Sequence, residues 1–139
     1  MRFSKWQAAG NVYLIAEPTE GAERLTPDAV REAATGTDGI LEVLAVDGPA
    51  ASIVIWNPDG STAEMSGNGT RIVARWLAGV SGERDVRIRV GPRAVSARLL
   101  DGGLIEQDMG EVTVGASEQV DGVTLRTVSV GNPHAVVEA

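Results

Sequence analysis

Residues 57–71 read Asn-Pro-Asp-Gly-Ser-Thr-Ala-Glu-Met-Ser-Gly-Asn-Gly-Thr-Arg, a pattern typical of a turn followed by a glycine-flanked loop. The chain then enters a segment in which apolar residues recur at helical spacing, namely Ile72, Val73, Trp76 and Leu77. This spacing predicts a helix over about residues 70–77, and Gly79 supplies a stop signal. A turn, a loop and an apolar helix therefore follow one another directly.

The loop in front of this helix predicts an anion-binding site. A helix start leaves several backbone N–H groups without partners and carries a partial positive charge, so a carboxylate or phosphate binds there readily. Gly67 and Gly69 lack the Cβ atoms that would keep a ligand from the backbone, while Ser66 and Asn68 are good N-cap residues. The same residues also fit an ordinary N-capped core helix with glycines for close packing, and the local pattern leaves both readings open.

The composition is that of one globular domain. With 139 residues, of which 43% are hydrophobic, the chain is long enough to bury a core. A net charge of -7 and a pI of about 4.6 argue against nucleic acid or an anionic membrane as a partner. The absence of cysteine excludes disulfides, thiolate metal sites and a cysteine nucleophile, and a single histidine argues against a histidine metal centre. We therefore expect no metal.

The sequence shows no secretory or membrane-spanning segment. Residues 1–7 lack the apolar stretch of a signal peptide, and no apolar run reaches the roughly 20 residues that span a bilayer. A cytoplasmic location is therefore expected.

Most of the chain reads as short strands separated by turns. Strands are expected at residues 2–6, 12–16, 40–46, 51–56, 86–90, 95–99, 104–109 and 124–130. A short helix is expected at residues 26–34, with Thr26 as N-cap, Pro27 at the first helical position and Gly36 at its end. Residues 91–93 predict a hairpin turn, and residues 110–122 a polar connection.

The end of the chain falls inside a predicted element. Residues 131–139 begin a new turn and a new apolar strand. A natural terminus usually closes an element or ends in polar residues, so we expect this chain to be cut from a larger protein.

Short segments in order along the whole chain resemble the N-terminal half of the diaminopimelate epimerase family. They are Phe3-Ser4-Lys5 with Gly10-Asn11, Thr37-Asp38-Gly39-Ile40-Leu41, Asn57-Pro58-Asp59-Gly60-Ser61, Ser66-Gly67-Asn68-Gly69 with Arg71, Met109-Gly110, and Gly131-Asn132-Pro133-His134. The resemblance implies an α+β fold in which a mixed or antiparallel sheet rolls around a central helix, as one lobe of a two-lobed protein. Residues 1–112 are then the first lobe, and residues 113–139 the truncated start of the second.

The resemblance also implies a function. It is cofactor-independent epimerisation of LL-diaminopimelate to meso-diaminopimelate, in the biosynthesis of lysine and peptidoglycan precursors, as part of a longer chain. This chain alone is expected to be inactive. A small amino acid is the expected partner, and a homodimer is compatible with the family.

Site residues follow from the same resemblance. Backbone N–H groups of Gly67 and Asn68 would hold the substrate's α-carboxylate. Asn11, Asn57 and Asn132 would bind its distal amino acid end, where uncharged amides offer both donors and acceptors. Taken without the family, each of these three asparagines reads as a turn residue.

The chemistry needs two groups that flank Cα, and in the family both are cysteines. The first of them falls on Ser66 here, and a hydroxyl is a poor base unless a neighbour takes its proton. His134 is the candidate neighbour, so Ser66 and His134 are the predicted catalytic residues. Their structural readings are a helix N-cap for Ser66 and a turn or packing residue for His134. Val12 also departs from the family, which usually has Asp there, and this suggests a divergent member.

Other functions fit parts of the pattern. One is an enzyme like proline racemase or hydroxyproline dehydratase, because that group includes members with a hydroxyl residue in place of one cysteine. Another is an amino-acid-binding lobe that performs no chemistry. Nucleotide binding is disfavoured, since a P-loop lysine does not follow Gly69 and the third glycine of a Rossmann motif is absent.

Overall fold

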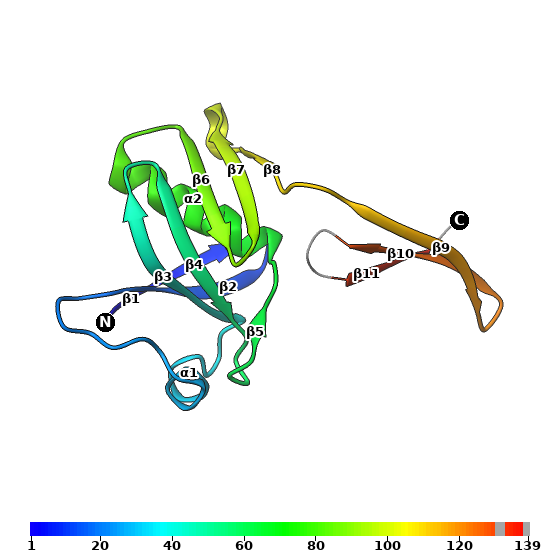
Figure 1. The fold of residues 1–139 in the computed structure, drawn as a ribbon, viewed down its shortest axis with the longest axis horizontal. Coiled ribbons are helices and arrows are strands. Elements are labelled where there is room, and N and C mark those ends of the chain that lie inside the picture. Colours follow the sequence, from blue (N-terminus) through cyan, green and yellow to red (C-terminus); the bar gives the residue numbers. More distant parts are fainter. Residues whose placement is uncertain (130–132, 138–139) are drawn as a thin grey trace.

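The computed structural model describes residues 1–129 and 133–137 of the chain. Within these residues it forms two sheets, two α-helices and one short 3-10 helix (Figure 1). In chain order the elements are β1 (Arg2–Ala8), β2 (Asn11–Glu17), α1 (Pro27–Ala33), β3 (Gly39–Asp47), β4 (Ala50–Trp56), β5 (Thr62–Ala63), α2 (Gly67–Ser81), β6 (Asp85–Val90), β7 (Arg93–Leu99), the 3-10 helix η1 (Asp101–Gly103), β8 (Ile105–Asp108), β9 (Thr113–Val120), β10 (Val123–Ser129) and β11 (Pro133–Val137).

A mixed sheet rolls around helix α2, as Figure 1 shows. Its strand order is β1-β2-β3-β4-β6-β7-β8, and β5 pairs with β4. The β2–β3 and β4–β6 pairs are parallel, and the other pairs are antiparallel. Helix α2 packs against strands from both ends of this order, including β1 and β8. It buries Gly69, Thr70, Ile72, Val73, Ala74, Trp76, Leu77 and Ala78. The predicted α+β fold, with a sheet rolled around a central helix, is confirmed.

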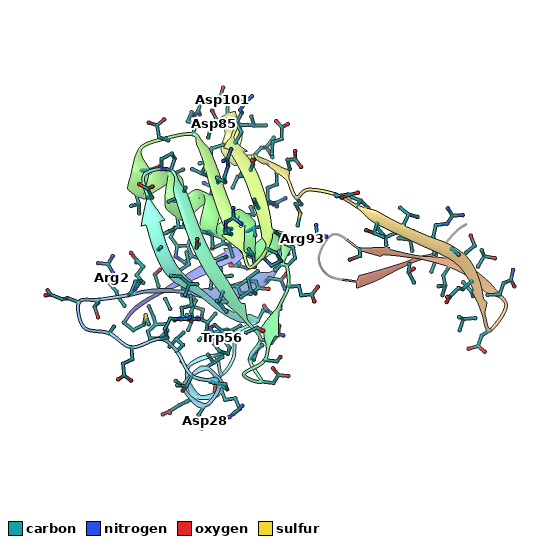
Figure 2. The ribbon with its side chains drawn as sticks, viewed as in Figure 1. Arg2, Asp28, Trp56, Asp85, Arg93 and Asp101 are labelled. Carbon is teal, nitrogen blue, oxygen red and sulfur yellow. The ribbon has the colours of Figure 1, made fainter. Side chains whose placement is uncertain are left out.

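Helix α1 covers the opposite face of the sheet. Its Val30 packs with Ala34, Ile40 and Trp56 in a second apolar cluster, and Figure 2 shows Trp56 on the side of the sheet where α1 lies. The first half of β3 is therefore buried on both faces. Glu42 lies in this stretch and is only 1% exposed, and it accepts a hydrogen bond from Trp56 Nε1 at 2.9 Å.

Helix α2 is longer at both ends than the sequence predicted. It begins at Gly67 because Ser66, in an extended conformation, is the N-cap. Gly79 does not stop the helix, so that prediction was wrong. The left-handed residue is Gly82, with φ 76°, and its N–H bonds the Ala78 carbonyl at 2.9 Å. A glycine ends a helix only where the chain adopts that conformation.

Residues 110–122 were predicted as a polar connection, and this was wrong because they contain β9. Strand β9 pairs with β10, which pairs with β11, in a three-stranded sheet that Figure 1 shows apart from the rolled sheet. Asp121 and Gly122 form the β9–β10 turn, with φ of 50° and 77°. Positive φ at both central residues marks a type I′ hairpin, for which Asp-Gly is a strong sequence signal.

Arg93 fixes the start of the connection between the two sheets. Its guanidinium Nη1 donates to the carbonyl oxygens of Met109 and Glu111, at 3.4 and 3.2 Å. Figure 2 shows Arg93 on the side of the rolled sheet that faces the three-stranded sheet. The chain after β8 is therefore anchored before it leaves the rolled sheet.

Candidate functional site

Several predicted site segments meet at one edge of the rolled sheet. Strand β2 begins at Asn11, and the parallel strand β3 begins at Gly39, which pairs with Tyr13. Strand β4 runs antiparallel to β3 and ends at Trp56, directly before Asn57. The starts of β2 and β3 and the end of β4 therefore share an edge, and hydrogen bonds join the start of α2 to β2 there.

Ser66 closes the start of α2 in a way that leaves two backbone donors open. Its Oγ accepts the Gly69 N–H at 3.0 Å, and its carbonyl accepts the Thr70 N–H at 2.9 Å. Among the described residues, nothing accepts a hydrogen bond from the N–H of Gly67 or Asn68. The described first turn of α2 also holds no acidic side chain, so its positive end is not neutralised locally. The arrangement is suited to an anion.

The two glycines of this loop differ in what the fold requires of them. A Cβ on Gly69 would lie 3.0 Å from Leu41 Cδ2 and 3.1 Å from Ser66 Oγ, so these neighbours would have to shift to admit it. A Cβ on Gly67 would meet only the end of Met109, at 3.9 Å, which is ordinary contact. The close approach of a ligand gives a reason for Gly67 that packing does not.

Asn68 is not the N-cap but the second residue of α2, and its side chain reaches β2. Its Nδ2 donates to Asn11 Oδ1 at 2.6 Å. Asn11 lies directly after a tight turn in which Ala9 and Gly10 have φ of 47° and 85°. Both asparagines are half-buried, and the bond leaves Asn11 Nδ2 as a donor and Asn68 Oδ1 as an acceptor. The structure thus brings together Asn11, Ser66, Gly67 and Asn68.

Two further residues support the same place and were missed from the sequence. Tyr13 Oη lies 3.1 Å from Ser66 Oγ. Thr70 Oγ1 donates to Gln107 Oε1 at 2.7 Å, and Gln107 Nε2 donates to the Gly67 carbonyl at 3.1 Å. The inward alternation of Tyr13 and Ile15 in β2 was a sequence signal for the first, whereas nothing in the sequence signalled Gln107.

Asn57 is engaged in its own turn. Its Nδ2 donates to Ser61 Oγ at 3.0 Å, and its carbonyl accepts the Gly60 N–H at 3.0 Å. Asp59 completes the turn by accepting hydrogen bonds from the hydroxyl and the N–H of Ser61, and these bonds lower the pKa of Asp59. No hydrogen bond within the described residues joins the Asn57 side chain to Asn11 or Ser66.

The remaining predicted residues lie toward the end of the chain. The backbone of His134, in β11, pairs with that of Val128 in β10, and the His134 side chain lies outside what the structure describes. Asn132 lies outside the described residues. The predicted pairing of Ser66 with His134 therefore stays a prediction.

Other features of the described surface lie away from these residues. Residues 1–129 and 133–137 contain no group of three or more side chains that could hold a metal ion, and no helix among them is long and apolar enough to cross a membrane. A hollow of about 460 Å³ lies on the outer face of β6, β7 and β8, lined in part by Arg87, Ser96 and Glu106. Asp85 bonds Arg98 there at 2.7 Å. None of the predicted site residues lines this hollow.

Solved structures share this fold at low sequence identity. A predicted epimerase from Pseudomonas aeruginosa matches with a TM-score of 0.71 at 16% identity, over 92% of this chain and 53% of that one. A phenazine biosynthesis protein from Bacillus anthracis matches with a TM-score of 0.60 at 15% identity, over 97% of this chain and 53% of that one. This chain therefore shares its fold with about half of each of these two proteins.

The chain belongs to the diaminopimelate epimerase family, whose model matches residues 3–115. Diaminopimelate epimerase 2 of Nostoc sp. is 33% identical, over 99% of this chain and 57% of that protein. The diaminopimelate epimerases of Laribacter hongkongensis and Acidiphilium cryptum are 32% and 33% identical, over 58% and 55% of their lengths. This chain thus spans little more than half the length of these relatives. Epimerases are isomerases, so the family is one of isomerases.

Proposed function

We propose that this chain is the amino-acid-binding first lobe of an enzyme that interconverts LL- and meso-diaminopimelate without a cofactor. The observation that carries the proposal is the start of α2, where the open N–H groups of Gly67 and Asn68 lie beside the Asn68–Asn11 hydrogen bond. Family membership supports the substrate. The product would serve lysine and peptidoglycan precursor biosynthesis in the cytoplasm.

The proposed substrate places one end on the helix start. Its α-carboxylate accepts hydrogen bonds from the N–H groups of Gly67 and Asn68, which also face the positive end of the helix dipole. Asn11, Asn57 and Asn132 bind the distal amino and carboxylate groups. Asn57 takes this role by exchanging its bond to Ser61 for one to the substrate.

The proposed reaction moves a proton at Cα. A base removes it from one face, the electron pair spreads into the α-carboxylate, and an acid returns a proton to the opposite face. The N–H groups on the carboxylate stabilise the charge that develops there, which is the role of an oxyanion hole. Ser66, with His134 as its partner, is the candidate group on one face. Residues 113–139 begin the second lobe, which carries the group on the other.

Proton exchange with solvent tests this function. The protein encoded by the complete gene is incubated with LL-diaminopimelate in deuterium oxide, and the product is analysed by NMR and chiral chromatography. Deuterium at Cα together with inversion is the expected result, and the 139-residue chain alone should give neither. A folded complete protein that releases water from hydroxyproline, and leaves diaminopimelate unlabelled, would instead establish the dehydratase alternative.

One observation favours a second candidate, a lobe that binds an amino acid without chemistry. Ser66 Oγ already accepts the Gly69 N–H and pairs with Tyr13, so it is poorly placed to act as a base. Ser66→Cys in the complete protein separates the two. Exchange that exists only in the cysteine variant supports a binding lobe, whereas exchange in the wild type rules it out.

A further inference from the structure

The side chain of Tyr13, in β2, contacts the start of α2. It is 9% exposed and belongs to the core cluster, and its hydroxyl lies 3.1 Å from Ser66 Oγ. The ring is held closely, because a Cβ on the neighbouring Gly39 would lie only 3.1 Å from Tyr13 Cε1. A buried phenol is thus aimed at the hydroxyl that caps the proposed carboxylate site.

The direction of this hydrogen bond follows from burial. If Ser66 donated to Tyr13, the buried phenol proton would need another acceptor, and none lies within the described residues. A buried donor left without a partner destabilises the folded protein. If Tyr13 donates instead, the proton left over belongs to the half-buried Ser66, where water or a ligand accepts it. Donation from Tyr13 to Ser66 is therefore the direction that leaves no buried donor without a partner.

This direction determines what Ser66 can do. A hydroxyl oxygen has one proton and two lone pairs. The Gly69 N–H occupies one lone pair, at 3.0 Å, and the Tyr13 hydroxyl occupies the other. Ser66 is then left as a donor, and accepting two bonds strengthens it in that role. Its proton joins the N–H groups of Gly67 and Asn68 at the same helix start.

We propose that Tyr13 is a positioning residue that fixes Ser66 as a hydrogen-bond donor to the α-carboxylate of the substrate. The inference rests on the proposed function for the identity of that substrate. It assigns Ser66 to carboxylate binding instead of proton abstraction, in agreement with the second candidate function and not with the catalytic role given to Ser66 in the first. It also makes Tyr13 the residue that selects an anion for this position.

A double-mutant cycle tests the coupling. The 139-residue chain, Tyr13→Phe, Ser66→Ala and the double variant are labelled with ¹⁵N and titrated with meso-diaminopimelate, following the amides of Gly67 and Asn68. Tyr13→Phe should weaken binding about three- to tenfold when Ser66 is present, the worth of one hydrogen bond. It should have no effect in the Ser66→Ala background. An equal loss in both backgrounds, or no loss in either, overturns the proposal, because a merely structural Tyr13 acts independently of Ser66.

Two further measurements separate this inference from the proposed function. The same cycle with acetate probes the carboxylate alone. Acetate binding with the expected coupling, in a protein that does not bind diaminopimelate, shows that the substrate is wrong and the donor role right. Tyr13 is the single tyrosine of the sequence, so its ¹³Cζ resonance reports the bond without any ligand. The chemical shift of that resonance should change in Ser66→Ala and remain unchanged in the exposed control Ser96→Ala. An unchanged shift in Ser66→Ala would overturn the proposed hydrogen bond between Tyr13 and Ser66.

Discussion

The rolled sheet of residues 2–108 and the three-stranded sheet of residues 113–137 use their apolar side chains differently. In the rolled sheet, Leu77, Ile88 and Val95 are all 0% exposed and pack in one core around α2. In the three-stranded sheet, Val114 and Val123 are 55% and 43% exposed. The first region is stabilised by burial. The second is held by its backbone ladder, and no described layer covers its valines.

The difference shows that a paired sheet need not be a strongly stabilised one. Hydrophobic burial is the dominant favourable term in folding, and strand pairing alone adds little net free energy. The rolled sheet can therefore hold the start of α2 rigidly, which the proposed carboxylate site requires. The three-stranded sheet should contribute little to that rigidity.

The largest effect should come from a core truncation in the rolled sheet. Leu77→Ala should lower the free energy of unfolding by about 2–5 kcal/mol, because it opens a cavity in the core. The matched change Val123→Ala should alter it by less than about 0.5 kcal/mol. Urea unfolding followed by far-UV circular dichroism measures both. Similar losses for the two variants would show that Val123 is packed as tightly as Leu77, and the contrast between the sheets would be lost.

A buried carboxylate gives the next largest effect. Glu42 accepts hydrogen bonds from Trp56 Nε1 at 2.9 Å, from the Leu25 N–H at 3.0 Å and from Arg24 Nε at 3.2 Å. Glu42→Gln leaves one acceptor oxygen and turns an amide donor toward donors, so it should cost about 1–3 kcal/mol. Glu118→Gln, on the exposed strand β9, should change nothing measurable in the same urea titration. If Glu42→Gln left the free energy of unfolding unchanged, water would be replacing the lost acceptor.

Gly69 and Gly67, both in the first turn of α2, show the same contrast between a tightly packed position and one with room for a Cβ atom. Gly69→Ala should destabilise by about 1 kcal/mol or more, since its Cβ would press on Leu41 at 3.0 Å. Gly67→Ala should stabilise the free protein by about 0.4–1 kcal/mol, because its Cβ finds space and the unfolded chain loses freedom. The same methyl group should weaken binding of meso-diaminopimelate. Unchanged binding by Gly67→Ala would remove ligand approach as the reason for that glycine.

The sequence predicted those elements in which burial of one face produces a local pattern of apolar and polar residues. Val86, Ile88 and Val90 alternate with arginines and an aspartate because one face of β6 is covered, and the strand was found from that alternation. The loop and an N-cap residue before α2 were recognised, but the helix was expected from about residue 70 and begins at Gly67. Strand β9 was missed because its side chains are mostly exposed, so that no alternation is needed.

The candidate site was only partly predictable because its contacts are long-range. Tyr13 meets Ser66 across 53 positions, and Gln107 meets Thr70 across 37. Those contacts depend on the register of β2 and β8 against α2, which no local pattern specifies. Family resemblance pointed to Asn11 and Asn68 but not to their bond, and it did not indicate that Asn57 would be engaged by Ser61.

The smallest effect concerns the turn before the site, which belongs to the rolled sheet and is held by side chains. Hydrogen bonds from Ser61 lower the pKa of Asp59, with Arg31 as the weakest contributor. A lowered folded pKa gives stability that is present above the ordinary pKa of aspartate and is lost as the pH falls through the lowered value. Ser61→Ala should therefore raise the pKa of Asp59 toward its ordinary value, measured by NMR titration of the carboxyl carbon.

Arg31→Gln is the control for this titration, and it should move the pKa of Asp59 less than Ser61→Ala does. The reverse order would show that the charge of Arg31, and not the hydrogen bonds of the turn, sets the pKa of Asp59.

Ser61→Ala also frees the Asn57 amide from its bond to Ser61 Oγ. If Asn57 leaves the turn to bind the substrate, affinity for meso-diaminopimelate should not fall in this variant. A clear loss of affinity would mean that the intact turn, and not a released Asn57, serves the site.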